Sequence, residues 1–599
     1  MDYITGQFGS DIPTISGDGG PYWEDGIASD AYYAAIERGN ESRALSAEKF
    51  STISALVNSR IAPDHDKLRR MWRNMVLMDE HTWTSYQSIS DPHSEESVEQ
   101  LKVKDSRATR AQSLVDNVMR RSMGSIADSI SAPKGNLIVF NPLNWRRSAL
   151  VEFDLPNGRE LVDNTTSKPV PYQVLSAGKS YHRVRFMATE VPALGYKAYK
   201  LKETKSKPIK PQSTKVTTLE SPYYKVELDP QTGAVRSILD KQLNKELVDK
   251  SSPYRFDQYV YVTGADHLPN RLVQYRTVSP LPHLTPHPSA GGRLVSVFKT
   301  PFGPEARMVS SAPNTPRIET TVLLFNNQKR IEFVNRIQKK EVFTKEGVYF
   351  SFPFAMSHPA FQYEIQNGEV NPSKDMLPGA GLEWFSVQHW VSVQQAGISA
   401  TVLPLDASMV TLGDIARGTW PTKFGQRKGT IFSYVMNNYW DTNYRGGQGG
   451  NFTFRYVITS GTGTNPTALS RLGWESITPM ETDDIVSQDK AINVPRPLSG
   501  AESSFLSISN HNVLLDTWKQ AEDGNGTIMR FLNMSGQPGE VKVATPLLKV
   551  KSAWLCNAME ADKQQITEIG LHGFSFNIAP HQIVTVRING SPTLSPPAM

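Results

Sequence analysis

One short stretch of the sequence, Asp79-Glu80-His81-Thr82-Trp83, combines carboxylate, imidazole and hydroxyl groups. It follows an amphipathic helical pattern and precedes a loop, so its side chains would gather at the mouth of a helix bundle. Carboxylate and imidazole are zinc ligands, but a catalytic zinc needs about three protein ligands and an open position. A metal here would have to draw its other ligands from elsewhere. The alternative is an ordinary surface helix end, where a histidine also suits the helix dipole.

Two other segments have the composition of a carbohydrate contact. Tyr22 and Trp23 lie among glycines and acidic residues in "GGPYWEDG", directly before a predicted helix. An aromatic ring on a loop can cover the C–H face of a sugar, or it can instead staple onto the first helix. Residues 436–450, "MNNYWDTNYRGGQGG", offer Trp440 and several amide side chains beside Gly-rich turns. A sugar contact and a tight loop of a β-sandwich are both compatible with this segment.

Other catalytic signatures are missing from the sequence. It contains no GxSxG elbow, no Walker A loop and no HExxH motif. Its single cysteine, Cys556, excludes disulfides and cysteine-rich zinc clusters within one chain. Cys556 lies in the apolar run "AWLCNAM", which predicts a packed side chain and not a nucleophile.

Length and composition describe an ordinary globular protein of several domains. The 599 residues suggest roughly four domains. A hydrophobic fraction of 39% and a charged fraction of 21% exclude a disordered or fibrous chain. A net charge of +5 over this length provides no footprint for nucleic acid, and no apolar run approaches the ~20 residues of a membrane helix. The first twenty residues lack the pattern of a signal peptide, so the sequence leaves the localisation undetermined.

The elements that would position these residues change character near residue 131. Pro and Gly are sparse from Ser29 to Ile130 and frequent afterwards. The first part predicts three helices: from about Ser29 to Asn58, within residues 62–81, and from near Ser94 onward. The apolar stripe of the second helix would be Leu68, Met71, Trp72, Met75 and Val76. Three such helices would pack as an antiparallel bundle.

From Gly135 onward, short alternating or β-branched runs are separated by turn residues, which predicts antiparallel β-sandwiches. "DPQTG" predicts a hairpin through Gly233. A polar linker at 202–213 and a composition change near 480–500 suggest further boundaries. The expected fold class is α+β and multidomain. The expected units are a terminal loop (1–28), a three-helix bundle (29–131), a small β domain (132–201), a large β-sandwich (214–485) and a C-terminal β-sandwich (486–599).

These segments, in this order, resemble the glycoside hydrolase family 38 α-mannosidases along nearly the whole chain. "GPYWEDGIASDAYYAAIERGNESRALSAEKF" resembles the segment that ends the catalytic domain and opens the bundle. "MDEHTWTSYQSISDP" is similar to a variant of the family's "HHDAITGT" motif, and "LIVFNPLNWRRSALVEF" resembles the strand that follows the bundle. Segments that begin "YYKVELDPQTG", "SYVMNNYW" and "TWKQAEDG" resemble the later β domains, of which the large one is galactose mutarotase-like.

The resemblance implies a retaining, zinc-dependent exo-glycosidase in which an N-terminal α/β barrel precedes the bundle and the sandwiches. In members of that family, zinc holds the 2- and 3-hydroxyls of a terminal α-mannoside, and an aspartate attacks the anomeric carbon. By resemblance, His81 falls on the zinc-ligand histidine, and Trp23, with Tyr22 beside it, falls on the aromatic beneath the mannose. Thr82 stands where many members have an acid, and Glu80 would make that sugar contact from the other side.

The resemblance also implies that the other zinc ligands, the nucleophile and the acid/base belong to a barrel that ends with residues 1–28. Retaining chemistry needs two carboxyl groups about 5–5.5 Å apart, and no pair in this sequence matches those roles. We therefore expect this chain alone to be inactive or nearly so. Its expected partners are a carbohydrate and either the missing barrel or further copies of itself. The alternative is a non-catalytic carbohydrate-binding or scaffolding protein that uses aromatics such as Trp440.

Overall fold

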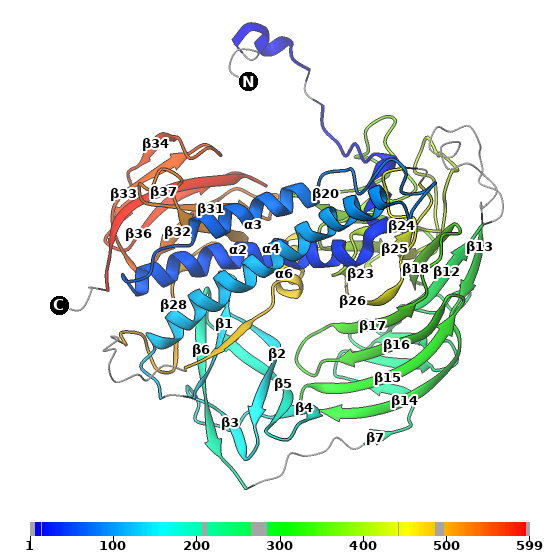
Figure 1. The fold of residues 1–599 in the computed structure, drawn as a ribbon, viewed down its shortest axis with the longest axis horizontal. Coiled ribbons are helices and arrows are strands. Elements are labelled where there is room, and N and C mark those ends of the chain that lie inside the picture. Colours follow the sequence, from blue (N-terminus) through cyan, green and yellow to red (C-terminus); the bar gives the residue numbers. More distant parts are fainter. Residues whose placement is uncertain are drawn as a thin grey trace.

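The computed structural model describes residues 6–13, 15–133, 135–205, 213–264, 284–440, 442–485 and 496–594. Three long helices cross the middle of the molecule (Figure 1). The C-terminal β domain lies on one side of them and the large β-sandwich on the other, while a small β domain lies beneath (Figure 1). The helices therefore form the spine on which all three β regions meet.

The helical prediction is confirmed, because each expected helix is present close to its predicted position. Glu95 and Glu96 occupy the first turn of α4, and the Ser94 Oγ caps this helix by accepting a hydrogen bond from the Ser97 amide at 3.3 Å. Every helix in the described ranges is too short or too polar to cross a membrane. The helices are η1 (Gly9–Asp11), η2 (Tyr22–Asp30), α2 (Ala31–Val57), α3 (His65–Met78), α4 (Glu95–Asp128) and α6 (Pro466–Ile477).

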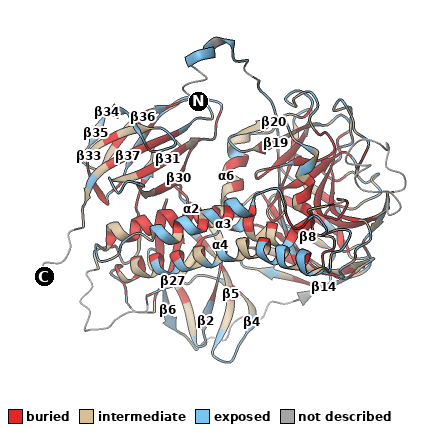
Figure 2. Ribbon diagram, turned by 45° about the horizontal axis from the view of Figure 1, so that its top comes forward, coloured by how far each residue is buried: buried red, intermediate tan, exposed pale blue. Residues whose placement is uncertain are grey.

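The inward faces of α2, α3 and α4 share one hydrophobic core. Phe50, Met71 and Val115 are all fully buried in it, one from each helix. Figure 2 shows the consequence, since buried and exposed residues alternate along the three helices. The predicted stripe of α3 was wrong at Val76, which is 66% exposed on the last turn of the helix. A hydrophobic repeat in the sequence cannot tell a residue that faces the core from one that is exposed on the surface.

The small β domain contains two antiparallel sheets, and one of them recruits distant strands. β27 pairs with β1 and β28 pairs with β6, so residues beyond 480 complete a sheet founded near residue 137. The larger sheet is β27 (Glu481–Asp484), β1 (Leu137–Asn141), β6 (Gly195–Glu203) and β28 (Glu502–Ser504), with β3 (Arg159–Asp163) also on β6. The smaller sheet is β2 (Arg147–Pro156), β5 (Tyr181–Val191) and β4 (Tyr172–Ala177). The domain boundaries given above stay predictions.

The large sandwich packs three antiparallel sheets around one core that contains Val226, Phe333 and Phe350. The predicted hairpin is confirmed, because β9 and β10 pair across a turn in which Gly233 has a φ of 71°. One sheet is β20 (Gly368–Val370), β19 (Ala360–Ile365), β22 (Val391–Gln395), β23 (Ile398–Pro404), β26 (Gly450–Gly461), β17 (Ile331–Lys339), β16 (Thr315–Leu324), β15 (Gly303–Ala312), β14 (Ala290–Thr300) and β7 (Ser213–Thr214). The second is β13 (Thr285–Pro288), β12 (Gln258–Thr263), β18 (Glu346–Pro353), β25 (Thr430–Asn437), β24 (Met409–Leu412) and β21 (Phe385–Ser386). The third is β11 (Lys245–Glu246), β10 (Ala234–Asp240), β9 (Tyr224–Asp229) and β8 (Thr218–Glu220).

The C-terminal sandwich continues the core of the bundle, since Trp518 and Phe531 belong to the same buried cluster as Phe50. Burial and the neighbouring Asp562 raise the pKa of Cys556 to about 11, so this half-buried thiol is protonated at neutral pH. One sheet is β29 (Ser507–Ile508), β32 (Gly539–Ala544), β36 (Gly573–Ile578) and β35 (Ile569–Gly570). The other is β30 (Val513–Gln520), β31 (Thr527–Asn533), β37 (Ile583–Pro592), β33 (Leu548–Cys556) and β34 (Asp562–Ile566).

Candidate functional site

The fold brings together the three segments that the sequence singled out. The loop after α3 rests on the loop after β25, because the amides of Trp83 and Thr84 both donate to the Asn443 carbonyl at 3.0 Å. The Thr442 hydroxyl donates to the Tyr86 carbonyl at 2.8 Å. One hydrophobic cluster includes Trp83 and Trp440, with Ile27 of η2 packed against it. We call this region, defined by Trp23, Glu80–Thr82 and Thr442–Asn443, the bundle-mouth site.

Three aromatic rings form a stack that ends at the surface of the bundle-mouth site. The Trp23 and Trp440 ring centroids are 4.9 Å apart, and those of Trp440 and Tyr444 are 4.7 Å apart, with 30° between the ring planes in both pairs. Trp23 is 45% exposed, whereas Trp440 is 2% and Tyr444 1% exposed. Only Trp23 can therefore present a ring face to a ligand, while the other two rings support it.

The polar side of the bundle-mouth site is the turn that follows α3. Glu80 bridges this turn: its Oε1 lies 2.9 Å from the His81 Nδ1, and its Oε2 accepts a hydrogen bond from the Thr82 amide at 3.0 Å. Lys104 of α4 donates to the Glu80 carbonyl and lies over the Trp83 ring. Although burial opposes the shift, these hydrogen bonds and nearby positive charges lower the pKa of Glu80. Glu80 is therefore ionised at neutral pH and orients the exposed His81 ring.

These residues do not by themselves form a zinc site. Among the described residues, no group of three or more His, Cys, Asp or Glu side chains is placed to hold a metal ion. His81 and Glu80 offer at most two ligands, fewer than the three that a catalytic zinc takes from protein. The His81 side chain is 75% exposed, so its ring is accessible to ligands from outside this chain. The remaining ligands of a zinc ion here would have to come from beyond the described residues.

Buried amides hold η2, and with it Trp23, in place. The Gln448 side chain accepts a hydrogen bond from the Ala31 amide and donates one to the Ala28 carbonyl, both at 2.9 Å. The Asn437 side chain donates to the Asp25 carbonyl at 2.7 Å. These bonds satisfy backbone groups of η2 and of the first residue of α2. The amide residues noted in segment 436–450 thus position the bundle-mouth site from beneath.

Gly26 leaves room for the aromatic stack, and its substitution tests that packing. A Cβ at this position would lie 2.0 Å from a ring carbon of Tyr444, which is itself fully packed. We expect Gly26→Ala to destabilise the protein by roughly 1–3 kcal/mol through overpacking, measured by thermal unfolding. Gly39→Ala is the control, because a Cβ there has nothing within 4 Å on an exposed face of α2. It should stabilise the helix by up to about 1 kcal/mol, and equal effects of the two variants would contradict the packing.

A layer of buried charge behind Trp23 was not predicted from the sequence. Arg417 forms an ion pair with Asp25, donates to the Tyr434 hydroxyl at 3.4 Å, and lies over the Trp384 and Tyr439 rings. Both members of the ion pair are nearly inaccessible to solvent. Burial raises the pKa of Asp25, and the Arg417 charge opposes that rise. No sequence motif marks this pair, because Asp25 and Arg417 come from distant parts of the chain.

Tyr22 faces this buried layer and not the bundle-mouth site. Its ring packs against Trp420, with 4.2 Å between centroids, and edge-on against Trp384 at 5.2 Å. The neighbouring Glu24 is also partly enclosed, and burial together with the charges of Asp18 and Asp25 raises its pKa to about 7. The structure gives Tyr22 a packing role, so we do not include it in the proposed sugar contact.

Two solved structures share this arrangement of a helical spine between β-sandwiches. One is an alpha-mannosidase from Enterococcus faecalis V583, with a TM-score of 0.70, 13% identity, and coverage of 95% of this chain and 69% of that chain. The other is a protein in the glycosyl hydrolase family 38 from Enterococcus faecalis, with a TM-score of 0.70, 13% identity, and coverage of 98% of this chain and 73% of that chain. The fold is thus that of α-mannosidase structures, and at this identity the likeness concerns the fold alone.

Two family models identify the β regions directly. The glycosyl hydrolases family 38 C-terminal domain matches residues 219–408, in the large sandwich, and the family 38 C-terminal beta sandwich domain matches residues 512–586. These two regions therefore match the C-terminal domains of glycoside hydrolase family 38, in agreement with the resemblance. A search of curated proteins found no match.

Proposed function

We propose that the bundle-mouth site is one wall of an α-mannoside-hydrolysing active site that a catalytic barrel completes. In this proposal Trp23 lies beneath the sugar ring, His81 supplies one zinc ligand, and Glu80 and Thr82 contact sugar hydroxyls. The observation that carries it is the stack of Trp23, Trp440 and Tyr444, whose exposed end is Trp23. The loop that carries Trp440 and Tyr444 is hydrogen-bonded to the segment that follows the exposed His81. Such a stack holds one aromatic face rigidly without filling it with a neighbour from this chain.

Exposed apolar side chains around the bundle-mouth site support a covering domain. Val76 and Leu77, on the last turn of α3, are 66% and 37% exposed, and Tyr86, after the His81 loop, is 79% exposed. Val103, next to Lys104 on α4, is 55% exposed. Exposed apolar groups that gather in one region mark interaction surfaces in soluble proteins. Aromatic and aliphatic side chains around one polar turn suit a domain interface better than open solvent.

Activity measurements test the composite site. We expect the isolated chain to hydrolyse 4-nitrophenyl α-D-mannopyranoside only at background rate with zinc present, and a preparation that contains the catalytic barrel to hydrolyse it readily. In that preparation, His81→Ala should lower kcat/KM by roughly 10–100-fold or more and reduce the bound zinc, since it removes a ligand.

The matched control is His511→Ala, which removes an exposed histidine of the C-terminal sandwich and should leave both activity and bound zinc unchanged. Strong zinc-dependent hydrolysis by the isolated chain would overturn the composite site. Full activity of the His81→Ala preparation would remove His81 from the proposal while leaving the rest of the wall to be tested through Trp23.

The structure disfavours one form of the non-catalytic alternative. A carbohydrate-binding protein that used Trp440 would need that ring at the surface, but Trp440 is 2% exposed beneath Trp23. Glycan binding that is unchanged by chelation and by His81→Ala would still favour a non-catalytic role. It would have to use a different surface from the one expected from the sequence.

A further inference from the structure

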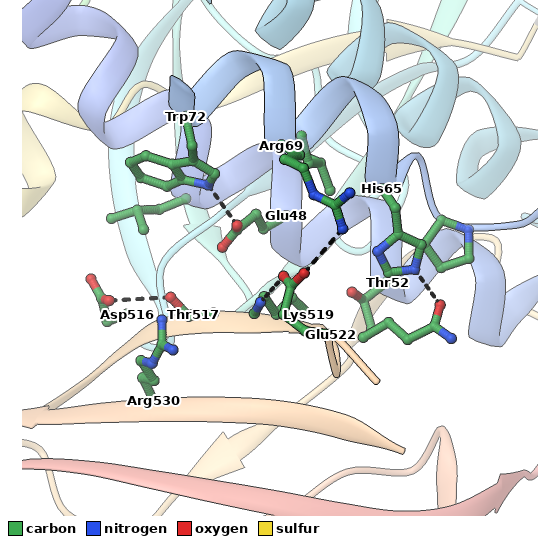
Figure 3. Close-up of a pocket in the computed structure, with 14 residues that line it drawn as sticks. Glu48, Thr52, His65, Arg69, Trp72, Asp516, Thr517, Lys519, Glu522 and Arg530 are labelled. Atoms are coloured by element: carbon green, nitrogen blue, oxygen red, sulfur yellow. Dashed lines mark hydrogen bonds and ion pairs between the residues drawn. The ribbon is translucent and has the colours of Figure 1, made fainter. Parts of the chain in front are cut away.

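A cavity lies at the seam between the helical bundle and the C-terminal sandwich, and none of the bundle-mouth residues lines it. Its volume is about 380 Å³, and α2 and α3 form one wall while β30 and β31 form the other (Figure 3). This volume is at the small end of ligand pockets, which suits one or two sugar rings better than a large cofactor. We call it the seam pocket. Its lining includes Glu48, Trp72, Asp516 and Arg530.

The walls of the seam pocket are fixed to one another. Thr52 of α2 donates to the Trp518 carbonyl at 3.1 Å, and Lys49 donates to the Leu515 carbonyl at 3.3 Å. On the outer side, His65 and Gln520 are hydrogen-bonded at 2.6 Å across the same seam. Because helix and strand are joined on both sides of the cavity, its shape exists before any ligand binds.

A β-bulge places Asp516 in the seam pocket. Leu515 pairs with Phe531 and Thr517 pairs with Arg530, so Asp516 is the extra residue on β30. Bulges re-aim a side chain and are common beside functional sites. The bulge thus brings the Asp516 carboxylate to the cavity wall that Arg530 also lines. In a regular strand, successive side chains would instead keep alternating between the two faces of the sheet.

The bundle side of the seam pocket offers an aromatic ring with a fixed orientation. The Trp72 Nε1 donates to the Glu48 Oε1 at 2.6 Å, which anchors the polar edge of the indole (Figure 3). Burial raises the pKa of Glu48 to about 7, with the Trp72 hydrogen bond opposing the shift. At neutral pH Glu48 therefore exists in both forms, and its carboxyl group can donate or accept a hydrogen bond.

The seam pocket is lined by both basic and acidic side chains. Several are already paired, since Glu522 lies 2.6 Å from the Lys519 Nζ and 3.3 Å from Arg69. An anion would be repelled by the acidic side chains and a cation by the basic ones, whereas a neutral polyhydroxyl ligand can bond to donors and acceptors at once. The basic side chains of the lining are Arg69, Lys519 and Arg530. The acidic ones are Glu48, Asp516 and Glu522.

We propose that the seam pocket binds a neutral sugar ring, with its C–H face on Trp72 and its hydroxyls on Asp516, Arg530 and Glu48. Carboxylate and guanidinium groups next to an indole match the alternating hydroxyls and apolar face of a pyranose. The site does not depend on the bundle-mouth site, because it shares no residue with it. It would give the protein a second carbohydrate contact, either with another part of the glycan bound at the bundle-mouth site or with a separate glycan.

Calorimetric titration with methyl α-D-mannopyranoside, methyl α-D-glucopyranoside and inorganic phosphate tests the seam pocket. We expect at least one glycoside to bind saturably. Trp72→Ala and Arg530→Met should each weaken that binding by about tenfold or more, the effect of losing a platform or a charged hydrogen-bond donor. If a thermal unfolding assay shows that Trp72→Ala does not fold, the effect of Arg530→Met on glycoside affinity tests the pocket.

Two control variants separate this pocket from other sites. Lys542→Met removes an exposed basic side chain of the same sandwich, and His511→Ala removes an exposed histidine of that sandwich. Neither should change glycoside affinity by more than about twofold. The proposal is overturned if neither glycoside binds, if phosphate binds more tightly than both, or if Trp23→Ala abolishes binding that Arg530→Met leaves intact. In that last case the bundle-mouth proposal survives and the seam pocket does not.

Discussion

Arg417→Met should destabilise the large sandwich by roughly 3–5 kcal/mol, because it leaves the buried Asp25 carboxylate without its partner. At about 2–4 °C per kcal/mol for a domain of this size, the corresponding loss in Tm is roughly 6–20 °C. Differential scanning calorimetry measures it directly. The control Arg183→Met removes an arginine that is 42% exposed and paired with Glu152 and Asp154, and should cost at most about 1 kcal/mol.

The destabilisation by Arg417→Met should also depend on pH with a definite sign. Burial already raises the pKa of Asp25 in the folded protein, and loss of the opposing Arg417 charge raises it further. A folded-state pKa above the unfolded value gives stability that is complete below the unfolded pKa and is lost as pH rises through the folded pKa. The variant should therefore lose less stability at pH 5 than at pH 8. A loss that grows towards low pH would contradict this assignment.

The double variant Asp25→Asn/Arg417→Met isolates the ion pair. With the carboxylate removed, the pH dependence should disappear, and part of the lost Tm should return, since no buried charge remains. A double variant that is as unstable as Arg417→Met at pH 8 would show that packing of Arg417 on Trp384 and Tyr439, and not the charge of Asp25, dominates.

The helices and the order of the β regions could be predicted from the sequence because their signals are local. A cap at Ser94, acidic residues in the first turn of α4 and the turn at Gly233 each act within a few residues. The continuous core from Phe50 to Trp518 could not be predicted, since it depends on which faces meet in space. The same holds for β27 and β28, whose partner strands β1 and β6 lie far away in the chain.

At the candidate site, residue types singled out the segments that the fold brings together, but the orientation of their side chains could not be predicted. The residue types at Trp23, at His81 and in segment 436–450 indicated binding chemistry, and the structure brings these segments together. Adjacent residues nonetheless face opposite ways: Trp23 reaches the surface, whereas Tyr22 packs inward on Trp384. Trp440, which the sequence offered as a sugar contact, is instead buried against Trp23. Only the tertiary packing decides which of two neighbouring aromatics is exposed.

The aromatic stack yields a prediction in which two tryptophans in contact behave oppositely. Trp440→Ala removes a ring that is 2% exposed between two others and should cost roughly 3–5 kcal/mol. Trp23→Ala removes the 45% exposed end of the stack and should cost only about 0.5–1 kcal/mol. Thermal unfolding of both variants, with Trp440→Phe as the conservative partner of the first, measures the difference.

Activity should follow the reverse order. In a preparation that contains the catalytic barrel, Trp23→Ala should weaken binding of an aryl α-mannoside by about tenfold, seen as a raised KM, because it removes the ring beneath the sugar. Trp440→Phe, which keeps a supporting ring under Trp23, should leave KM nearly unchanged while lowering Tm. If Trp23→Ala instead destabilises the fold as strongly as Trp440→Ala and leaves KM unaltered, Trp23 is a packing residue. The stack would then be a staple for the first helix and not a sugar platform.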